Sequence, residues 1–327
     1  MPANVKFTTD DRPVFASNET TWWGYQPEVT GRPLTFEEAW EQSGMGRYWI
    51  AEQPMRTEYG AVATHKALYL TDGLGEEDPT LLNVVTKDRK TWQPREALSL
   101  APAILEVAED EPVIQTLGML GNGGVWYATV MFPQEWVING DAYKGFIFVT
   151  DRVDGSCTAA PTPIRIVCGN TYNAAMSGLK GVARYVVRHT SNARLEADAA
   201  RKAIGMLPEY MAGFQESLEA LYAQDFDFDR FVELTDTVFG TPDPNAKTTR
   251  SQTIYDARRD NLARLWRADT QESTFRMGKP TKATAYHAFG EYCDWVYGTD
   301  AKRMQRAITA DYGPLKARVA DLLLASN

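Results

Sequence analysis

The sequence is poor in the residue types that most often bind metals or form covalent cross-links. It has only three cysteines and three histidines in 327 residues. The cysteines are odd in number and dispersed, so the sequence predicts neither a disulfide framework nor a zinc knuckle. No histidine has the spacing of a metalloprotease motif. We therefore expect reduced thiols, no metal site and no cofactor.

Long apolar runs are also absent. No stretch approaches the 18 or so uncharged residues that a membrane-spanning helix needs. The first residues, Met1 to Lys6, lack the apolar segment of a signal peptide. These absences predict a protein without a membrane partner that is located in the cytoplasm. The composition, 44% hydrophobic and 24% charged, excludes disordered and collagen-like chains.

Turn-forming residues separate strand-like runs between residues 113 and 168. The runs and the turns between them are Val113–Leu120, Gly121–Gly124, Val125–Phe132, Asn139–Gly140, Phe146–Val149, Asp154–Gly155 and a strand that ends in Pro163–Cys168. This pattern predicts an antiparallel meander of about four strands. Both alternating faces of Val125–Phe132 are apolar, so we expect that strand to be covered on both sides. Residues 59–70 and 81–86 are also strand-like.

Helical signals flank this meander. Thr35 and Glu38 have the spacing of a capping box and predict a helix over 36–43, and a second helix is expected from Pro94 to about residue 108. After Cys168 the apolar period changes to about 3.6. The helices predicted there cover 171–190, 193–223, 228–239, 253–268, 281–297 and 299–324, with Pro208 and Gly313–Pro314 as interruptions.

The predicted fold class is therefore α+β, with an antiparallel β-meander in the N-terminal half packed with helices and a mostly helical C-terminal half. The expected division is an aromatic and helical segment (1–57), a core domain of meander and helices (58–240) and a helical C-terminal region (241–327). The best linker, Thr241–Asn245, marks the second boundary.

The net charge of −9 hides two basic segments. Residues 179–202 contain six basic and two acidic side chains (+4), and residues 244–282 contain nine and four (+5). Solvated helix faces would explain this pattern, and so would a localised anion-binding groove. In the second segment Arg258 and Arg259 alternate with aromatic residues such as Tyr255 and Trp266, a mixture that single-strand binding requires.

The junction from Arg165 to Thr171 is the most suggestive local site. A strand that leads directly into a helix N-terminus directs free amide groups at one point, and Arg165 supplies a guanidinium suited to phosphate. Alternatively, Asn170 only caps the helix and Arg165 pairs with an acid. Two other motifs are rejected. Gly118–Gly124 is rich in glycine but lacks the lysine of a phosphate loop. Asp225–Asp229 has calcium-loop spacing, but Arg230 stands where a glycine is needed, which favours an acidic helix start.

These residues also carry a family resemblance. Asp154-Gly155-Ser156, followed by Pro163-Ile164-Arg165-Ile166-Val167-Cys168-Gly169-Asn170-Thr171, resembles the signature of the phage/plasmid-like family designated domain of unknown function 932. The glycine-rich turn and the strand from Val125 are similar to that family too. The resemblance implies a gene carried by bacteriophages or plasmids and a protein working in a bacterial cytoplasm. It brings no catalytic residues and no established activity.

The leading hypothesis is a phage-encoded protein that binds single-stranded DNA as a homo-oligomer, of the annealing type used in recombination, without covalent chemistry. The predicted nucleic-acid-binding residues are Arg165, Asn170, Thr171, Lys180, Arg184, Arg188, Arg258 and Arg259. The alternative is a protein-interaction module that acts on a host or defence protein, supported by the acidic balance and by 9 tryptophans and 15 tyrosines. An enzyme is the least supported class, because no nucleophile, metal or acid–base constellation is evident.

Overall fold

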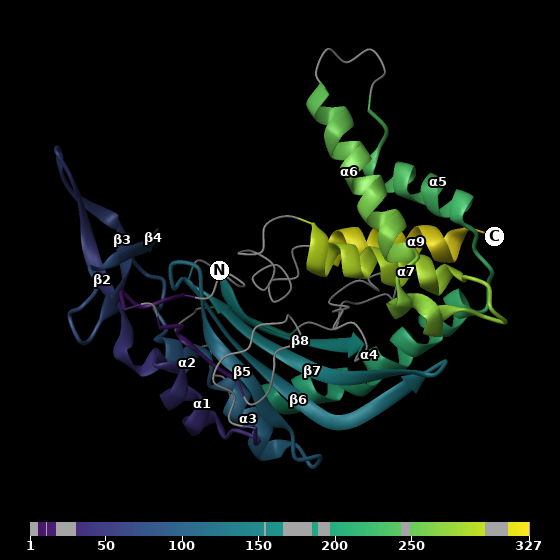
Figure 1. Ribbon diagram of the computed structural model, residues 1–327. Coiled ribbons are helices and arrows are strands. Elements are labelled where there is room, and N and C mark those ends of the chain that lie inside the picture. Colours follow the sequence, from purple (N-terminus) through teal and green to yellow (C-terminus); the bar gives the residue numbers. More distant parts are fainter. Residues whose placement is uncertain are drawn as a thin grey trace.

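The computed structural model describes residues 6–10, 12–17, 31–153, 155–165, 185–188, 197–242, 249–297 and 313–326. Its strands are β1 (Phe15–Ser17), β2 (Tyr48–Thr57), β3 (Gly60–Asp72), β4 (Thr80–Thr86), β5 (Val113–Leu120), β6 (Val125–Ile138), β7 (Asp141–Arg152), β8 (Ser156–Arg165) and β9 (Tyr185–Arg188). Its helices are α1 (Phe36–Ser43), α2 (Pro94–Ala97), α3 (Leu100–Val107), α4 (Ala197–Tyr222), α5 (Phe228–Phe239), α6 (Thr249–Trp266), α7 (Lys282–Glu291) and α9 (Gly313–Ala325). The α+β prediction is confirmed: the sheets lie in the N-terminal half and helices dominate the C-terminal half (Figure 1).

The predicted meander forms the centre of a six-stranded antiparallel sheet in the order β1-β5-β6-β7-β8-β9. Its tight turns have the predicted chemistry. Asn139 and Gly140 both adopt positive φ, at 50° and 89°, as the two central residues of a hairpin turn between twisted strands require. Gly121 and Gly123 also adopt positive φ, and the segment is a hairpin turn and not a phosphate loop.

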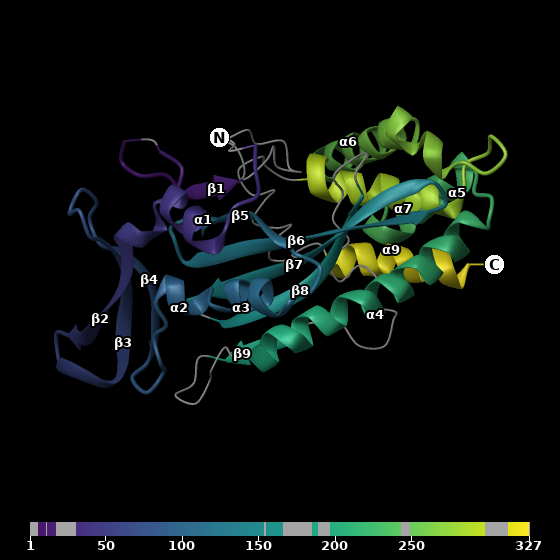
Figure 2. The ribbon, with the colours of Figure 1, turned by 90° about the horizontal axis from the view of Figure 1, so that it is seen from below.

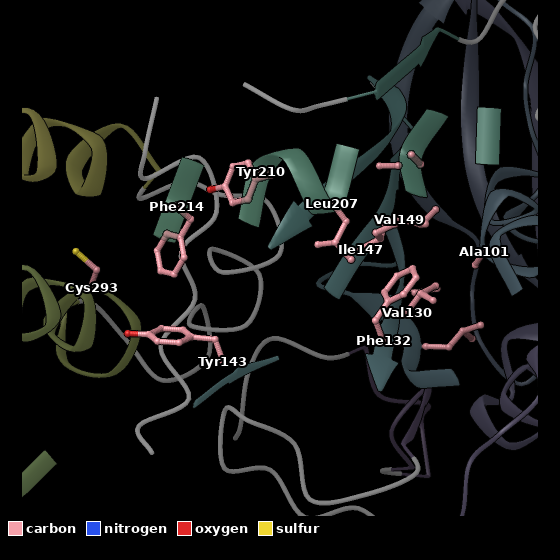
Figure 3. Packing of buried hydrophobic residues seen from close by; sticks show 14 of the residues in the cluster. Ala101, Val130, Phe132, Tyr143, Ile147, Val149, Leu207, Tyr210, Phe214 and Cys293 are labelled. Atoms are coloured by element: carbon pink, nitrogen blue, oxygen red, sulfur yellow. The ribbon is translucent and has the colours of Figure 1, made fainter. Parts of the chain in front are cut away.

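Strand β6 is covered on both faces, as its sequence predicts: residues 125–130 and Phe132 are all buried. One face of the sheet packs against α3 and the long helix α4, which runs across it (Figure 2). Leu207 of α4 lies beside Ile147 and Val149 of β7 in this core (Figure 3). A smaller apolar cluster on the sheet includes Tyr127, Phe146 and Phe148, all buried.

A second, three-stranded sheet (β2-β3-β4) projects from the main body (Figure 1). Its inner face, including Ile50, Leu70 and Val85, is buried in the main core cluster. The side chain of Gln93 donates to the carbonyl of Ile50 (3.1 Å) and accepts from its N–H (2.8 Å), so it occupies part of the free edge of β2. The expected boundary at 57/58 falls in the turn between β2 and β3.

The C-terminal helices pack into a cluster in which α7 contacts α6 and α9, and α5 contacts α9. The capping box of Thr35 and Glu38 starts α1, and α5 has the predicted bounds. Lys316 of α9 bonds Asp294 at 2.6 Å, and both side chains are almost fully buried. A buried pair of this kind fixes one arrangement of α9, because either charge alone would be costly to bury.

Three secondary-structure predictions need correction. Residues 185–188, predicted as the end of a helix, form strand β9, which pairs with Ser156–Ala159; the β-branched Val186 and Val187 suit an edge strand. The helix expected from Pro94 to 108 is divided into α2 and α3. Helix α4 continues through Pro208, which is exposed, so that water can bond the carbonyl that proline leaves without a donor.

Within the described part of the chain, no helix combines the length and apolar character needed to cross a bilayer.

Candidate nucleic-acid interface

Of the predicted binding residues around the strand–helix junction, the structure describes only some. Asn170, Thr171, Lys180 and Arg184 lie outside the described residues. Arg165 is the last residue of β8 and pairs with Tyr143, whereas Arg188 in β9 pairs with Ser156 at the opposite end of β8. Nine residues of extended strand separate these ends, roughly 30 Å. Only an extended ligand could contact both positions.

Arg258 and Arg259 are neighbours in α6 but lie in different surroundings. The guanidinium carbon of Arg258 lies 4.1 Å from the centroid of the Phe239 ring. Burial raises the pKa of Tyr292, and a hydrogen bond from Arg258 acts in the opposite direction. Arg258 is thus held against the helix cluster. Arg259 instead lines a hollow between α5 and α6, together with Arg267.

We call this hollow the α5–α6 groove. It has a volume of about 480 Å³ and is lined by Phe228, Phe231, Val232, Thr235, Asp256, Arg259, Asp260, Ala263 and Arg267. Helices α5 and α6, whose residues line the groove, lie on the opposite side of the molecule from the three-stranded sheet (Figure 1). Of the predicted nucleic-acid-binding residues, Arg259 lines this groove.

Local sequence explains why α5 begins beside α6. Asp227 caps α5 by accepting a hydrogen bond from the N–H of Arg230 (2.8 Å). The rings of Phe226, Phe228 and Phe231 pack around Trp266, with centroid distances of 6.4, 6.3 and 4.5 Å. The predicted acidic helix start is confirmed. Trp266, expected as a base-stacking residue, is only 5% exposed and belongs to the core.

A hydrogen-bonded chain holds the other end of the groove. Tyr255 of α6 donates to Asp236 of α5 (2.8 Å) and accepts from Arg259 (3.2 Å). The bond to Asp236 raises the pKa of Tyr255 above its ordinary value, because the carboxylate stabilises the protonated hydroxyl. Since Tyr255 bridges the two helices, it fixes both the width of the groove and the position of Arg259.

The groove is lined by charged side chains of both signs. Among the described residues, Arg259, Arg267, Asp256 and Asp260 form no salt bridge. The Arg267 guanidinium carbon lies 4.6 Å from the centroid of the Phe228 ring, and Asp256 accepts a hydrogen bond from Gln252 (2.8 Å). Such charges remain available to a ligand. Arg259 and Ala263 lie on one face of α6, and Arg267 directly follows the last residue of this helix. The spacing of four residues could have identified Arg267 from the sequence.

The carboxylates of the acidic segment before α5 make contacts within the protein. Asp225 binds Arg276 (2.6 Å), and Asp227 is the helix cap. In the ranges that the structure describes, no three histidine, cysteine or carboxylate side chains gather in a way that could hold a metal ion.

A second surface, which the sequence did not reveal, is the outer face of the three-stranded sheet. Trp49, Tyr69, Leu81 and Val84 share this face by their strand register. Trp49, Leu81 and Val84 are 44%, 50% and 40% exposed. Trp49 lies over Gly73, where a Cβ atom would approach its ring to 2.9 Å. Apolar residues alternate too little in β2 for its exposed side to be identified from the sequence.

Together these features define an α+β protein of two antiparallel sheets and a helical cluster that carries a charged groove with aromatic walls. Residues 81–311 match the family described as a domain of unknown function (DUF932), and the chain belongs to this family. The matched range includes the α5–α6 groove and begins in β4. No curated protein and no solved structure matches the chain.

Proposed function

We propose that the chain binds single-stranded nucleic acid at the α5–α6 groove. The observation that carries this proposal is the pair of guanidinium groups, Arg259 and Arg267, on the wall of a hollow that is also lined by the half-buried Phe228. Guanidinium groups bind phosphates, and aromatic and guanidinium planes stack on unpaired bases. Both contacts favour a single strand, because a duplex keeps its bases stacked and inside.

In this mechanism the protein performs no covalent chemistry. The arginines hold phosphates, the bases stay accessible, and a homo-oligomer extends the bound strand from one subunit to the next. We include Arg165, the last residue of β8, and Arg188, in β9 opposite the first residue of β8, as further phosphate contacts in this proposal. A protein of phage or plasmid origin would use this arrangement to anneal complementary strands during recombination.

The test is fluorescence anisotropy with a labelled 20-nucleotide single strand and its duplex across a salt titration. We expect tighter binding of the single strand. Each lost phosphate contact should reduce the slope of log K against log salt by about 0.7 for a single strand, so Arg259→Gln with Arg267→Gln should reduce it by about 1.4.

The control is Arg264→Gln, which removes one positive charge from an exposed position on α6 outside the groove and is compared with each single variant, Arg259→Gln and Arg267→Gln. It should keep the wild-type slope. Circular dichroism of all variants checks that they remain folded. Absence of single-strand binding at low salt, or an unchanged slope in the double variant, would contradict the proposal.

A second candidate function is favoured by the exposed apolar residues Trp49, Leu81 and Val84 on the outer face of the three-stranded sheet. Large contiguous apolar patches on a protein surface often mark interaction sites. This face suits a host or defence protein with an apolar surface of its own. It is independent of the groove, which lies in the helical region.

A photocrosslinking amino acid at Leu81 tests this candidate, with the same probe at Tyr59 as the control. Tyr59 is 92% exposed at the tip of the β2–β3 hairpin. One defined protein crosslinked from position 81, absent from position 59 and lost after Trp49→Ser, supports the docking face. Identical crosslinks from both positions would show that the face has no special affinity.

A further inference from the structure

The two aspartates in the α5–α6 groove need an explanation if a polyanion binds there. Asp256 and Asp260 are exposed, line the groove and form no ion pair among the described residues. Next to phosphates they would repel the ligand. Carboxylates are compatible with a nucleic acid where they accept hydrogen bonds from the amino groups of bases.

We propose that Asp256 and Asp260 select bases that carry an exocyclic amino group on the edge that faces the major groove in a duplex, namely cytosine and adenine. This inference rests on the proposed function. Asp260 is one helical turn after Asp256, so their carboxylates lie on the same side of α6, and the groove contains Arg259 between them in sequence. A nucleotide held by its phosphate at Arg259 would present its base to these carboxylates.

The geometry of the bases makes this selection compatible with annealing. The amino groups of cytosine and adenine each have two hydrogens, of which one is used in Watson–Crick pairing and the other points to the major-groove edge. A carboxylate that accepts the second hydrogen leaves the pairing edge free. Thymine presents a carbonyl oxygen and a methyl group at the same position, so it offers these aspartates no donor.

Gln252 already uses part of the hydrogen-bonding capacity of Asp256. Its side-chain amide donates to one oxygen of Asp256 at 2.8 Å. Among the described residues, none donates a side-chain hydrogen bond to the other oxygen of Asp256 or to either oxygen of Asp260, so these oxygens remain for a ligand. We therefore assign the larger share of the selection to Asp260.

The test compares the binding of 20-nucleotide oligo-dC and oligo-dT at pH 7.5 by anisotropy. These two polypyrimidines have the same backbone charge and differ at the position that the aspartates would read. Wild-type protein should bind oligo-dC roughly fivefold or more tightly, the discrimination expected of one base contact. Asp256→Ala with Asp260→Ala should bind oligo-dC more weakly and oligo-dT equally or more tightly, because repulsion is removed while the base contact is lost.

Glu233→Ala is the matched control, since Glu233 is an exposed carboxylate on α5 outside the groove. It should keep the preference for oligo-dC. Equal wild-type affinity for the two strands, or a double variant that gains affinity for both alike, would overturn the base selection and leave single-strand binding in place. Failure to bind either oligonucleotide would overturn the proposed function and this inference together.

Discussion

Replacing Asp72 with asparagine should locally destabilise the three-stranded sheet by about 3 kcal/mol. The Asp72 side chain is completely buried and receives two hydrogen bonds from Arg47, at 2.6 and 2.8 Å. It also accepts from the backbone N–H groups of Leu74, Glu76 and Glu77. Breaking a buried ion pair costs about 3–5 kcal/mol. We use the lower limit because Arg47 is 16% exposed and keeps its contact with Glu76.

Hydrogen exchange followed by mass spectrometry measures this local effect. A loss of about 3 kcal/mol corresponds to exchange roughly 150-fold faster in peptides of β2, β3 and β4. Peptides of α5 and α6 should exchange at the wild-type rate and act as the internal control. An increase in exchange rate below about fivefold in the sheet would refute the proposed stabilisation of the sheet by Asp72.

The effect of Asp72→Asn should depend on pH in a defined direction. The hydrogen bonds from Arg47 hold the pKa of Asp72 below its ordinary value of 3.8. A carboxyl group with a lowered pKa stabilises the fold fully above its unfolded pKa, and this contribution is lost as the pH falls towards the folded pKa. The difference in exchange between wild type and variant should therefore be constant from pH 5 to 8 and shrink below about pH 4. A difference that grows as the pH falls would contradict this linkage.

Two glycine and turn positions give further predictions. Gly145→Ala should lower stability by about 1–3 kcal/mol, because the new Cβ atom would lie 2.6 Å from a ring carbon of Trp136; an unchanged thermal midpoint would show that the ring moves freely. Met277→Asn should raise stability by about 1 kcal/mol, because Met277 is 98% exposed at a φ of 52° that asparagine adopts more readily; a lower thermal midpoint would contradict this reasoning.

Elements with local signals could be predicted from the sequence. The cap of α1 depends on residues three positions apart, and the β6–β7 turn depends on Asn139 and Gly140 alone. Helix α5 combines a cap at Asp227 with an apolar face of period 3.6, and its bounds match the prediction. Such signals are complete within a few residues and do not require knowledge of distant contacts.

Elements defined by distant partners were missed or misassigned. Strand β9 pairs with the start of β8, about 30 residues earlier in the chain, and helical periodicity in the surrounding sequence concealed it. Strand β2 was not predicted because its distal half is polar and exposed. Arg258 and Arg259 are adjacent in the sequence, yet only Arg259 lines the groove. The position of α5 decides which face of α6 borders the groove, and the local sequence does not contain that information.

The range of the family match separates the two candidate surfaces. The match over residues 81–311 contains every residue that lines the α5–α6 groove. The outer face of the three-stranded sheet depends on Trp49 and Tyr69, which precede the match. A binding activity common to the family would therefore reside in the groove, whereas docking at the sheet face would be a property added by strands β2 and β3. Loss of single-strand binding in the Arg259 and Arg267 variants, with docking retained, is the result that this division requires.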